Sequence, residues 1–147
     1  MKTGAYNFDV RINDNDEVIL MELGPRNGGN LIAEVIKYAT GVDTAEWTIK
    51  ASLGEDCSDL KMVDTKGYWS YTIIHSKNSG ILKSVIISEE LSKNIVELDI
   101  LSNIGDKVES FDNSGGTIGT TILKFDSMDE MLYKMDNMDR YIKVLTE

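Results

Sequence analysis

Two charged side chains and a pair of glycines follow a short apolar run near the start of the chain. Glu22 comes directly after this run, and Arg26 follows before Gly28 and Gly29. Carboxylate oxygens are the ligands that Mg2+ prefers, and a guanidinium group binds phosphate through paired hydrogen bonds. Glycine lets the backbone come close to a ligand. Residues 18–30 therefore indicate a site for a metal and a phosphate, or an ordinary Glu–Arg salt bridge at a strand end.

A second acidic side chain, Asp9, lies on a predicted strand over residues 4–12, where apolar and polar residues alternate. Residues 13–16, Asn-Asp-Asn-Asp, are typical of a hairpin turn, because Asn and Asp tolerate left-handed backbone conformations. The apolar run before Glu22 predicts a second, buried strand. Folding the strands about the turn places Asp9 roughly opposite Glu22, so we expect both carboxylates to converge on one divalent cation.

The glycine pair leads into a helical pattern over residues 31–40, for which Asn30 is the expected N-cap and Gly41 the stop. The amino end of this helix would point at the glycine loop, where free N–H groups favour an anion. Asp43 is the expected cap of a second helix that ends at Gly54. We assign the apolar faces of both helices to packing.

Beyond residue 54 the pattern changes to short strands and turns, and we place a boundary between two lobes there. Two strands are expected to form a hairpin around Asn-Ser-Gly at residues 78–80, and a later turn is expected at residues 113–116. Ser127 and Glu130 form a capping-box pattern before a closing helix with a stripe of methionines. The sequence thus predicts an α+β chain, with a twisted antiparallel β lobe over residues 55–147.

Composition limits the classes of function. With 25 acidic and 15 basic residues the net charge is −10, so we expect no nucleic-acid partner. Cys57 is the only cysteine, which favours a reducing cytoplasm and no disulfide. His75, the only histidine, is expected to be structural or at the surface. No apolar run approaches the length of a membrane span and no signal peptide is evident, so a membrane location is not expected.

At residues 4–9, 18–29 and 39–43 the sequence resembles the last part of the ATP-grasp fold. That fold is shared by biotin carboxylase, the large chain of carbamoyl phosphate synthetase and ATP-dependent carboxylate-amine ligases. The resemblance implies that residues 1–54 are the end of an ATP-grasp domain, with antiparallel strands and two helices. Short motifs such as Gly-Asp-x-Val at residues 105–108 extend the resemblance to the carboxy-terminal β subdomain of these enzymes.

The resemblance also implies roles for individual residues. Asp9 and Glu22 would be ligands of the Mg2+ that accompanies ATP, and Arg26 would be the catalytic contact to the transferred phosphate. Gly24 stands where the family has an Asn metal ligand, which puts the binding of a second Mg2+ in doubt. Contacts to the nucleotide cofactor are implied for Glu22, Asn27, Gly28, Gly29 and Asn30.

The implied function is the joining of a small carboxylate to an amine or a thiol through an acyl phosphate, driven by ATP. The lobe that clamps the nucleotide would precede Gly4, so the amino-terminal domains of the same polypeptide are the expected partner, and a homodimer is a further expected association. The chain alone should then be inactive. The alternative is a self-standing, non-catalytic module that binds a small anion or a protein partner through the Gly28–Gly29 loop.

Overall fold

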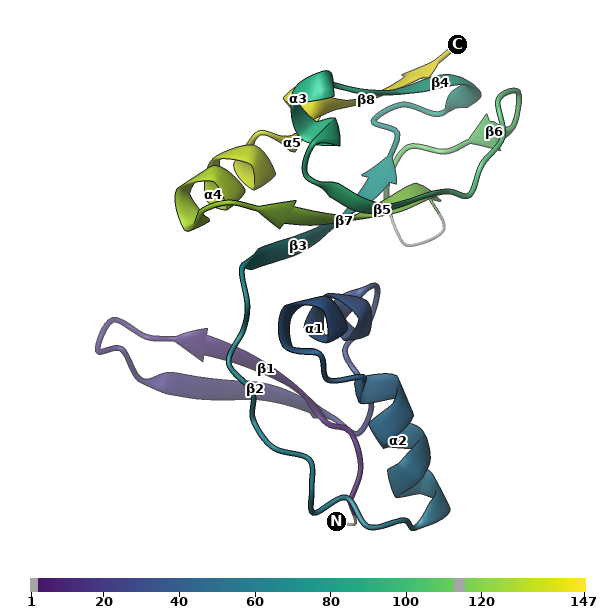
Figure 1. Ribbon diagram of the computed structural model, residues 1–147. Helices are drawn as coiled ribbons and strands as arrows, with labels where there is room; N and C mark the ends of the chain where they lie inside the picture. The colour runs from purple at the N-terminus through teal and green to yellow at the C-terminus, as the bar shows by residue number, and fades with distance from the viewer. Residues whose placement is uncertain (1–2, 113–115) are drawn as a thin grey trace. The chain divides into compact units, whose positions relative to one another are not determined.

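The computed structural model describes residues 3–112 and 116–147 (Figure 1). It divides into two compact units, Met1–Lys66 and Gly67–Glu147. The mixture of helices and antiparallel strands confirms the predicted α+β class. Residues 55–66, which the sequence pattern grouped with the second lobe, belong to the first unit instead. They are tied there because the Lys66 N–H donates a 2.7 Å hydrogen bond to the Ala39 carbonyl.

The first unit begins with a hairpin of strands β1 (Asn7–Ile12) and β2 (Val18–Gly24), which pair antiparallel. Its turn is the predicted one. The Asn13 side chain accepts hydrogen bonds of 2.9 and 3.0 Å from two backbone N–H groups of the turn, and Asp16 has a positive φ of 61°. Asn and Asp favour such turns because they form these local bonds at low cost.

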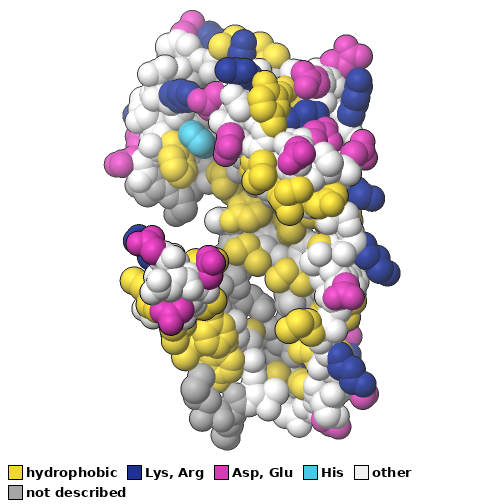
Figure 2. Space-filling view, turned by 90° about the vertical axis from the view of Figure 1, so that its left-hand side faces the viewer, with side chains coloured by type: hydrophobic (Ala, Val, Ile, Leu, Met, Phe, Trp, Pro, Cys, Tyr) yellow, Lys and Arg dark blue, Asp and Glu magenta, His cyan; other side chains and the backbone are white. Residues whose placement is uncertain are grey.

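The expectation of a buried second strand is wrong. Val18, Ile19 and Leu20 are 66%, 44% and 56% exposed. The reason is that the hairpin is a two-stranded sheet, and in the part of the chain that the structure describes neither strand pairs with a third. Apolar side chains (yellow) are visible over the face drawn in Figure 2, with acidic and basic side chains interspersed among them.

Two helices follow the hairpin, α1 (Ile32–Thr40) and α2 (Thr44–Leu53). Both end as predicted, at Gly41 and Gly54, whose φ values of 81° and 78° suit glycine. Asp43 caps α2 as predicted, since its side chain accepts hydrogen bonds from two backbone N–H groups at 3.1 Å.

The predicted cap of α1 is wrong. Leu31 precedes the first helical residue, and Asn30 lies one position earlier with a left-handed φ of 54°. The N-terminal turn of α1 therefore has no side-chain cap. Asn30 instead lies in the turn that precedes the helix, where a left-handed conformation is required; Asn adopts this conformation more readily than most other non-glycine residues.

The second unit contains two antiparallel sheets where the sequence predicted one. The first has the order β3-β7-β5 and the second β6-β4-β8. The strands are β3 (Tyr68–His75), β4 (Gly80–Ile87), β5 (Ile95–Ile100), β6 (Lys107–Val108), β7 (Thr117–Phe125) and β8 (Ile142–Thr146). The helices are α3 (Glu89–Ser92), α4 (Met128–Asp136) and α5 (Met138–Tyr141). Most of the turn expected at residues 113–116 lies outside the described residues.

The predicted hairpin around residues 78–80 does not form, because β3 and β4 belong to different sheets. Gly80 serves another purpose. A Cβ atom there would lie 2.3 Å from the backbone oxygen of Glu147, so the absence of a side chain lets the end of the chain approach. The Ile81 N–H then donates to this oxygen at 2.9 Å. Pairing of β4 with β8 therefore replaces the hairpin.

The core of the second unit consists of two apolar clusters. One contains Ile74, Leu82, Val108 and Ile118, and the other Leu91, Leu123, Phe125 and Tyr141. The predicted methionine stripe contributes only in part: Met131, Met135 and Met138 pack on the second cluster, whereas Met128 is 47% exposed.

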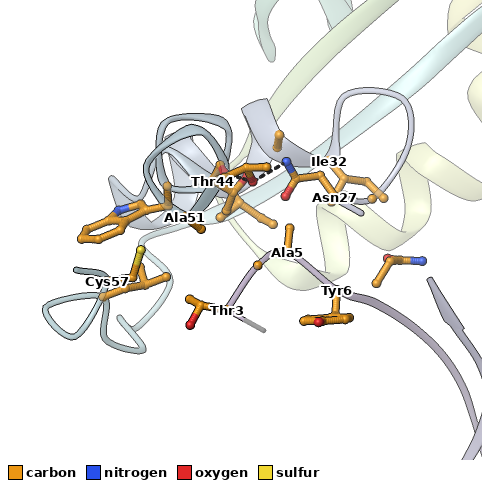
Figure 3. A pocket seen from close by; sticks show the side chains of 16 residues that line it. Thr3, Ala5, Tyr6, Asn27, Ile32, Thr44, Ala51 and Cys57 are labelled. Carbon is orange, nitrogen blue, oxygen red and sulfur yellow. Dashed lines mark hydrogen bonds between the residues drawn. The ribbon is translucent and has the colours of Figure 1, made fainter. Parts of the chain in front are cut away.

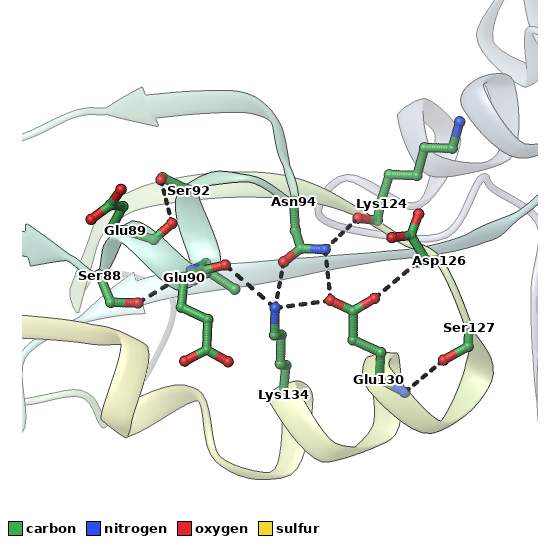
Figure 4. A network of polar contacts seen from close by, with 11 residues as sticks. Ser88, Glu89, Glu90, Ser92, Asn94, Lys124, Asp126, Ser127, Glu130 and Lys134 are labelled. Atoms are coloured by element: carbon green, nitrogen blue, oxygen red, sulfur yellow. Dashed lines mark hydrogen bonds and ion pairs between the residues drawn. The ribbon is translucent and has the colours of Figure 1, made fainter.

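A buried lysine joins three elements of the second unit (Figure 4). The Lys134 ammonium donates hydrogen bonds to a carboxylate oxygen of Glu130 at 2.9 Å, to the side-chain oxygen of Asn94 at 2.8 Å and to the Glu90 carbonyl at 3.4 Å. The second Glu130 oxygen accepts from the Asp126 N–H at 3.0 Å, where a capping box would place the Ser127 N–H. The Lys134 hydrogen bond and the Asp126 N–H lower the pKa of Glu130 to about 2.

Candidate functional site

The register of the hairpin brings the two predicted metal-binding carboxylates together. Asp9 on β1 is the direct partner of Glu22 on β2. Residues that oppose each other in an antiparallel pair place their side chains on the same face, so the predicted juxtaposition is confirmed. A β-bulge follows at once, because Val10 pairs with Leu20 and leaves Met21 without a partner residue. Bulges of this kind are frequent next to functional sites.

Asn7 and Gly24 pair two positions further along the ladder and share this face with the two acids. The Asn7 amide donates a 3.1 Å hydrogen bond to Asp9. Asp9 and Glu22 are exposed, and neither forms an ion pair with another described residue. Two carboxylates without an ion pair are suitable ligands for Mg2+, because Mg2+ is commonly held by one or two carboxylates together with phosphate oxygens of a substrate.

No group of three or more His, Cys, Asp or Glu side chains among residues 3–112 and 116–147 could hold a metal ion by itself. The donor set instead fits a cation that is shared with a phosphate-bearing ligand.

Arg26 occupies the turn that follows β2. Its backbone N–H donates to the Gly24 carbonyl at 2.9 Å, and its guanidinium donates to the carbonyl of Asn27 at 2.9 Å. Arg26 is exposed and forms no ion pair with Glu22 or with another described residue. The structural Glu–Arg salt bridge that the sequence also allowed is therefore not what holds this turn. The Asn27 carbonyl engages only one of the guanidinium donors.

The loop after Arg26 is held by the helices. The Asn27 side-chain amide donates a 2.9 Å hydrogen bond to the hydroxyl of Thr48 on α2, marked by the dashed line in Figure 3. A Cβ atom at Gly28 would lie 2.9 Å from the Ile32 side chain, so this glycine is required for packing against α1. At Gly29, by contrast, no described heavy atom lies within 4 Å of such a Cβ. Gly29 is the open position of the loop.

The loop borders a pocket of ≈ 260 Å³ in the first unit (Figure 3). Its walls come from the residues before β1, from the Asn27–Gly28 loop, from both helices and from the segment around Cys57. Apolar side chains such as Ile32 and Trp47 contribute much of its lining. Sequence reasoning missed Thr48, because its position in an amphipathic helix pattern gave no indication of a contact with the loop.

Some acidic groups elsewhere in the described residues are bound to basic partners. Asp43 lies 2.7 Å from the Lys37 ammonium, and this hydrogen bond is the main reason that the pKa of Asp43 is lowered. The His75 ring packs on Phe111 with centroids 4.4 Å apart, and its Nδ1 lies 3.2 Å from the Ile73 carbonyl, contacts typical of the structural residue that the sequence predicted.

Comparison with models of known protein families gave no match, and neither did a comparison with curated proteins. Solved structures, however, match nearly the whole chain. Phosphoribosylglycinamide synthetase from Anaerococcus prevotii is 26% identical with a TM-score of 0.73, and the match covers 98% of this chain and 37% of that one. L-amino acid ligase from Bacillus licheniformis is 17% identical with a TM-score of 0.78, over 98% of this chain and 36% of that one.

The chain has the fold of the carboxy-terminal part of an ATP-grasp enzyme. A third similar structure is the biotin carboxylase domain of 2-oxoglutarate carboxylase from Hydrogenobacter thermophilus, a complex with MgADP, ADP and bicarbonate. It is 14% identical with a TM-score of 0.68, and the match covers 97% of this chain and 32% of that one. The chain thus spans about a third of the length of these ATP-grasp proteins.

No helix among its described residues has the length and apolar character needed to cross a membrane.

Proposed function

We propose that the chain is the carboxy-terminal part of an ATP- and Mg2+-dependent ligase that joins a small carboxylate to an amine or a thiol through an acyl phosphate. The observation that carries the proposal is the pairing of Asp9 with Glu22 on one face of the hairpin, followed by the exposed Arg26 turn. The fold supports it, since the similar structures include a synthetase and a ligase. The amino-terminal domains of the same polypeptide would supply the nucleotide clamp.

In this proposal Asp9 and Glu22 hold Mg2+, and Asn7 and Gly24 flank them on the same face. The bound ion would neutralise the charge that develops on the transferred phosphate. Support comes from the similar biotin carboxylase domain, whose structure contains MgADP. Because Gly24 has no side chain, the protein contributes one ligand fewer than the family pattern has, and phosphate oxygens or water complete the shell.

Arg26 would bind the transferred phosphate or the acyl phosphate. A guanidinium group binds such oxyanions through two parallel hydrogen bonds, and only one of its donors is engaged by the Asn27 carbonyl. Gly29 and the uncapped amino end of α1 lie next in the chain and offer backbone N–H groups to the same anion. Asn27, Gly28 and Asn30, which the resemblance also assigns to the cofactor, would shape this loop.

The proposal also includes a cytoplasmic location, for which the single cysteine is the support. The predicted homodimer stays a prediction. The identities of the acid and of the amine are outside the proposal, because the domains that would select them are not among the residues of this chain.

The test uses the full-length polypeptide and has two parts. Arg26→Lys should lower turnover steeply while the thermal midpoint changes little, because lysine retains the charge but not the paired geometry. Mn2+, used as a paramagnetic probe for Mg2+, should broaden NMR signals near Asp9, and Asp9→Asn should abolish this effect.

Asp14→Asn is the matched control for the Mn2+ experiment, because it removes the same charge from the turn of the same hairpin. If both Asp variants weaken Mn2+ binding equally, the ion responds only to net charge and the proposed site is wrong. If Arg26→Lys melts much earlier while its folded fraction turns over normally, Arg26 is a structural residue.

A further inference from the structure

We propose that Thr48 is a positioning residue for Arg26, acting through Asn27, whose side chain contacts Thr48 and whose backbone carbonyl contacts the guanidinium. The inference rests on the proposed function of Arg26. It assigns a role to a helix residue that does not touch the phosphate site itself, and it explains how an exposed turn keeps its guanidinium in one orientation.

A chain of hydrogen bonds connects helix α2 to the guanidinium. The Thr48 hydroxyl donates to the Thr44 carbonyl at 2.7 Å and accepts from the Asn27 amide at 2.9 Å. The backbone carbonyl of Asn27 in turn accepts from the Arg26 guanidinium at 2.9 Å. Because the hydroxyl hydrogen is used within the helix, a lone pair of the oxygen is left to face the loop. The direction of each bond in the chain is therefore fixed.

Helix α2 holds the Thr48 hydroxyl in a fixed position. Asp43 caps its first turn, and the threonine χ1 angle is restricted because the side chain is β-branched. Thr48 and Asn27 are both half-buried, so water competes poorly for their hydrogen bond. Packing of Gly28 on Ile32 holds the loop from the side of α1. The hydrogen bond between Asn27 and Thr48 holds the loop from the side of α2.

A neighbouring residue on the same helix makes only half of these contacts. The Ser52 hydroxyl donates to the Thr48 carbonyl at 2.8 Å, the same bond within the helix that Thr48 makes with Thr44. Ser52 is exposed, and its hydroxyl forms no hydrogen bond with the described residues of the loop. Ser52→Ala is therefore a matched control for Thr48→Val. Both changes remove a hydroxyl that bonds the preceding helical turn, but only the second removes the acceptor for Asn27.

The experiment measures turnover of the full-length polypeptide with saturating ATP. Thr48→Val should lower kcat on the order of ten- to a hundredfold, because small misplacements of a positioning group have effects of this size. The KM for ATP should change little, and Ser52→Ala should leave kcat near the parent value. Thr48→Ser keeps the acceptor oxygen and should restore most of the activity. A comparable loss with Ser52→Ala, or no rescue by Thr48→Ser, would overturn the inference.

A double-mutant cycle distinguishes an effect of Thr48 that acts through Arg26 from an unspecific loss of activity. If Thr48 acts through Arg26, then Thr48→Val should have no further effect on kcat in an Arg26→Ala background. An undiminished effect in that background would contradict the inference.

Hydrogen exchange distinguishes failure of the inference from failure of the proposed function, because it needs no turnover. Thr48→Val should accelerate amide exchange over residues 24–29, whereas Thr48→Ser and Ser52→Ala should not. Unchanged turnover in Arg26→Ala together with accelerated exchange would refute the function but keep the link from Thr48 to the loop. Unchanged exchange in Thr48→Val would refute the link.

Discussion

Replacing Lys134 with Met should destabilise the second unit by about 2–3 kcal/mol at pH 7. The Lys134 side chain is only 8% exposed and donates three hydrogen bonds, one of them to the Glu130 carboxylate. Met fills the volume of the lysine stem but cannot donate. The cost is lower than for a fully buried ion pair, because Glu130 is 28% exposed and keeps hydrogen bonds from the Asp126 N–H and the Asn94 amide.

The loss should depend on pH in a direction that the Glu130 pKa determines. This pKa is lowered from 4.5 to about 2, first of all by the Lys134 hydrogen bond. A lowered pKa stabilises the folded state fully above the unfolded value of 4.5, and the contribution disappears as the pH falls toward about 2. A shift of this size corresponds to at most about 3 kcal/mol. The stability difference between parent and Lys134→Met should therefore be full at pH 7 and shrink below pH 4.5.

Urea unfolding of both proteins, followed by circular dichroism at several pH values, measures this difference. Lys83→Met is a suitable control, since the Lys83–Glu147 ion pair is exposed and should contribute less than about 1 kcal/mol. A stability difference that is the same at pH 7 and pH 3 would show that the cost of Lys134→Met comes from packing and would refute the electrostatic argument.

Three further predictions concern the first unit and its site. The 147-residue chain alone should show no ATP hydrolysis above background, because positioning of the phosphate needs the nucleotide clamp; turnover that Glu22→Ala abolishes would contradict this. Asp43→Ala should lower the thermal midpoint of the chain by roughly 2–6 °C through loss of the α2 cap, and an unchanged midpoint would show that the cap is dispensable. Gly24→Asn should fold normally, since a Cβ atom there meets only the Arg26 side chain at 3.8 Å, and it should tighten Mn2+ binding; weaker binding would show that an amide at this position is not a ligand.

The part of the fold that the sequence predicted correctly is governed by local contacts. The turn before β2 follows from the Asn13 side chain, and the limits of α2 follow from Asp43 and Gly54. The pairing of Asp9 with Glu22 needed only strand direction and turn length. Each of these features is determined by residues that are close in sequence, which is why single positions could be interpreted without an alignment.

Several errors arose where a contact with a distant part of the chain determines the structure, although the wrong α1 cap at Asn30 was a local error. Residues 78–80 have the composition of a hairpin turn. The glycine at position 80 is needed for a different reason, because the backbone of Glu147 comes close to it. Strand β8 was missed altogether, although Ile142, Val144 and Thr146 alternate with other residues in the manner of a strand. Thr48 was missed for the same reason: its partner Asn27 is far away in sequence, and a helical pattern does not reveal it.

Glu22 and Arg26 form no ion pair with each other, which agrees with the function proposed for the hairpin and its turn. Oppositely charged side chains do meet elsewhere in the chain, as Lys37 does with Asp43 and Lys134 with Glu130. Arg26 follows Glu22 closely in sequence, yet its guanidinium donates to a backbone carbonyl of its own loop and leaves the carboxylate free. A pairing between them would neutralise both groups and occupy the donors that an oxyanion needs. In the proposed function, keeping them apart would leave the carboxylates of the strand pair for a cation and the guanidinium of the turn for an anion, as a magnesium–phosphate ligand would need.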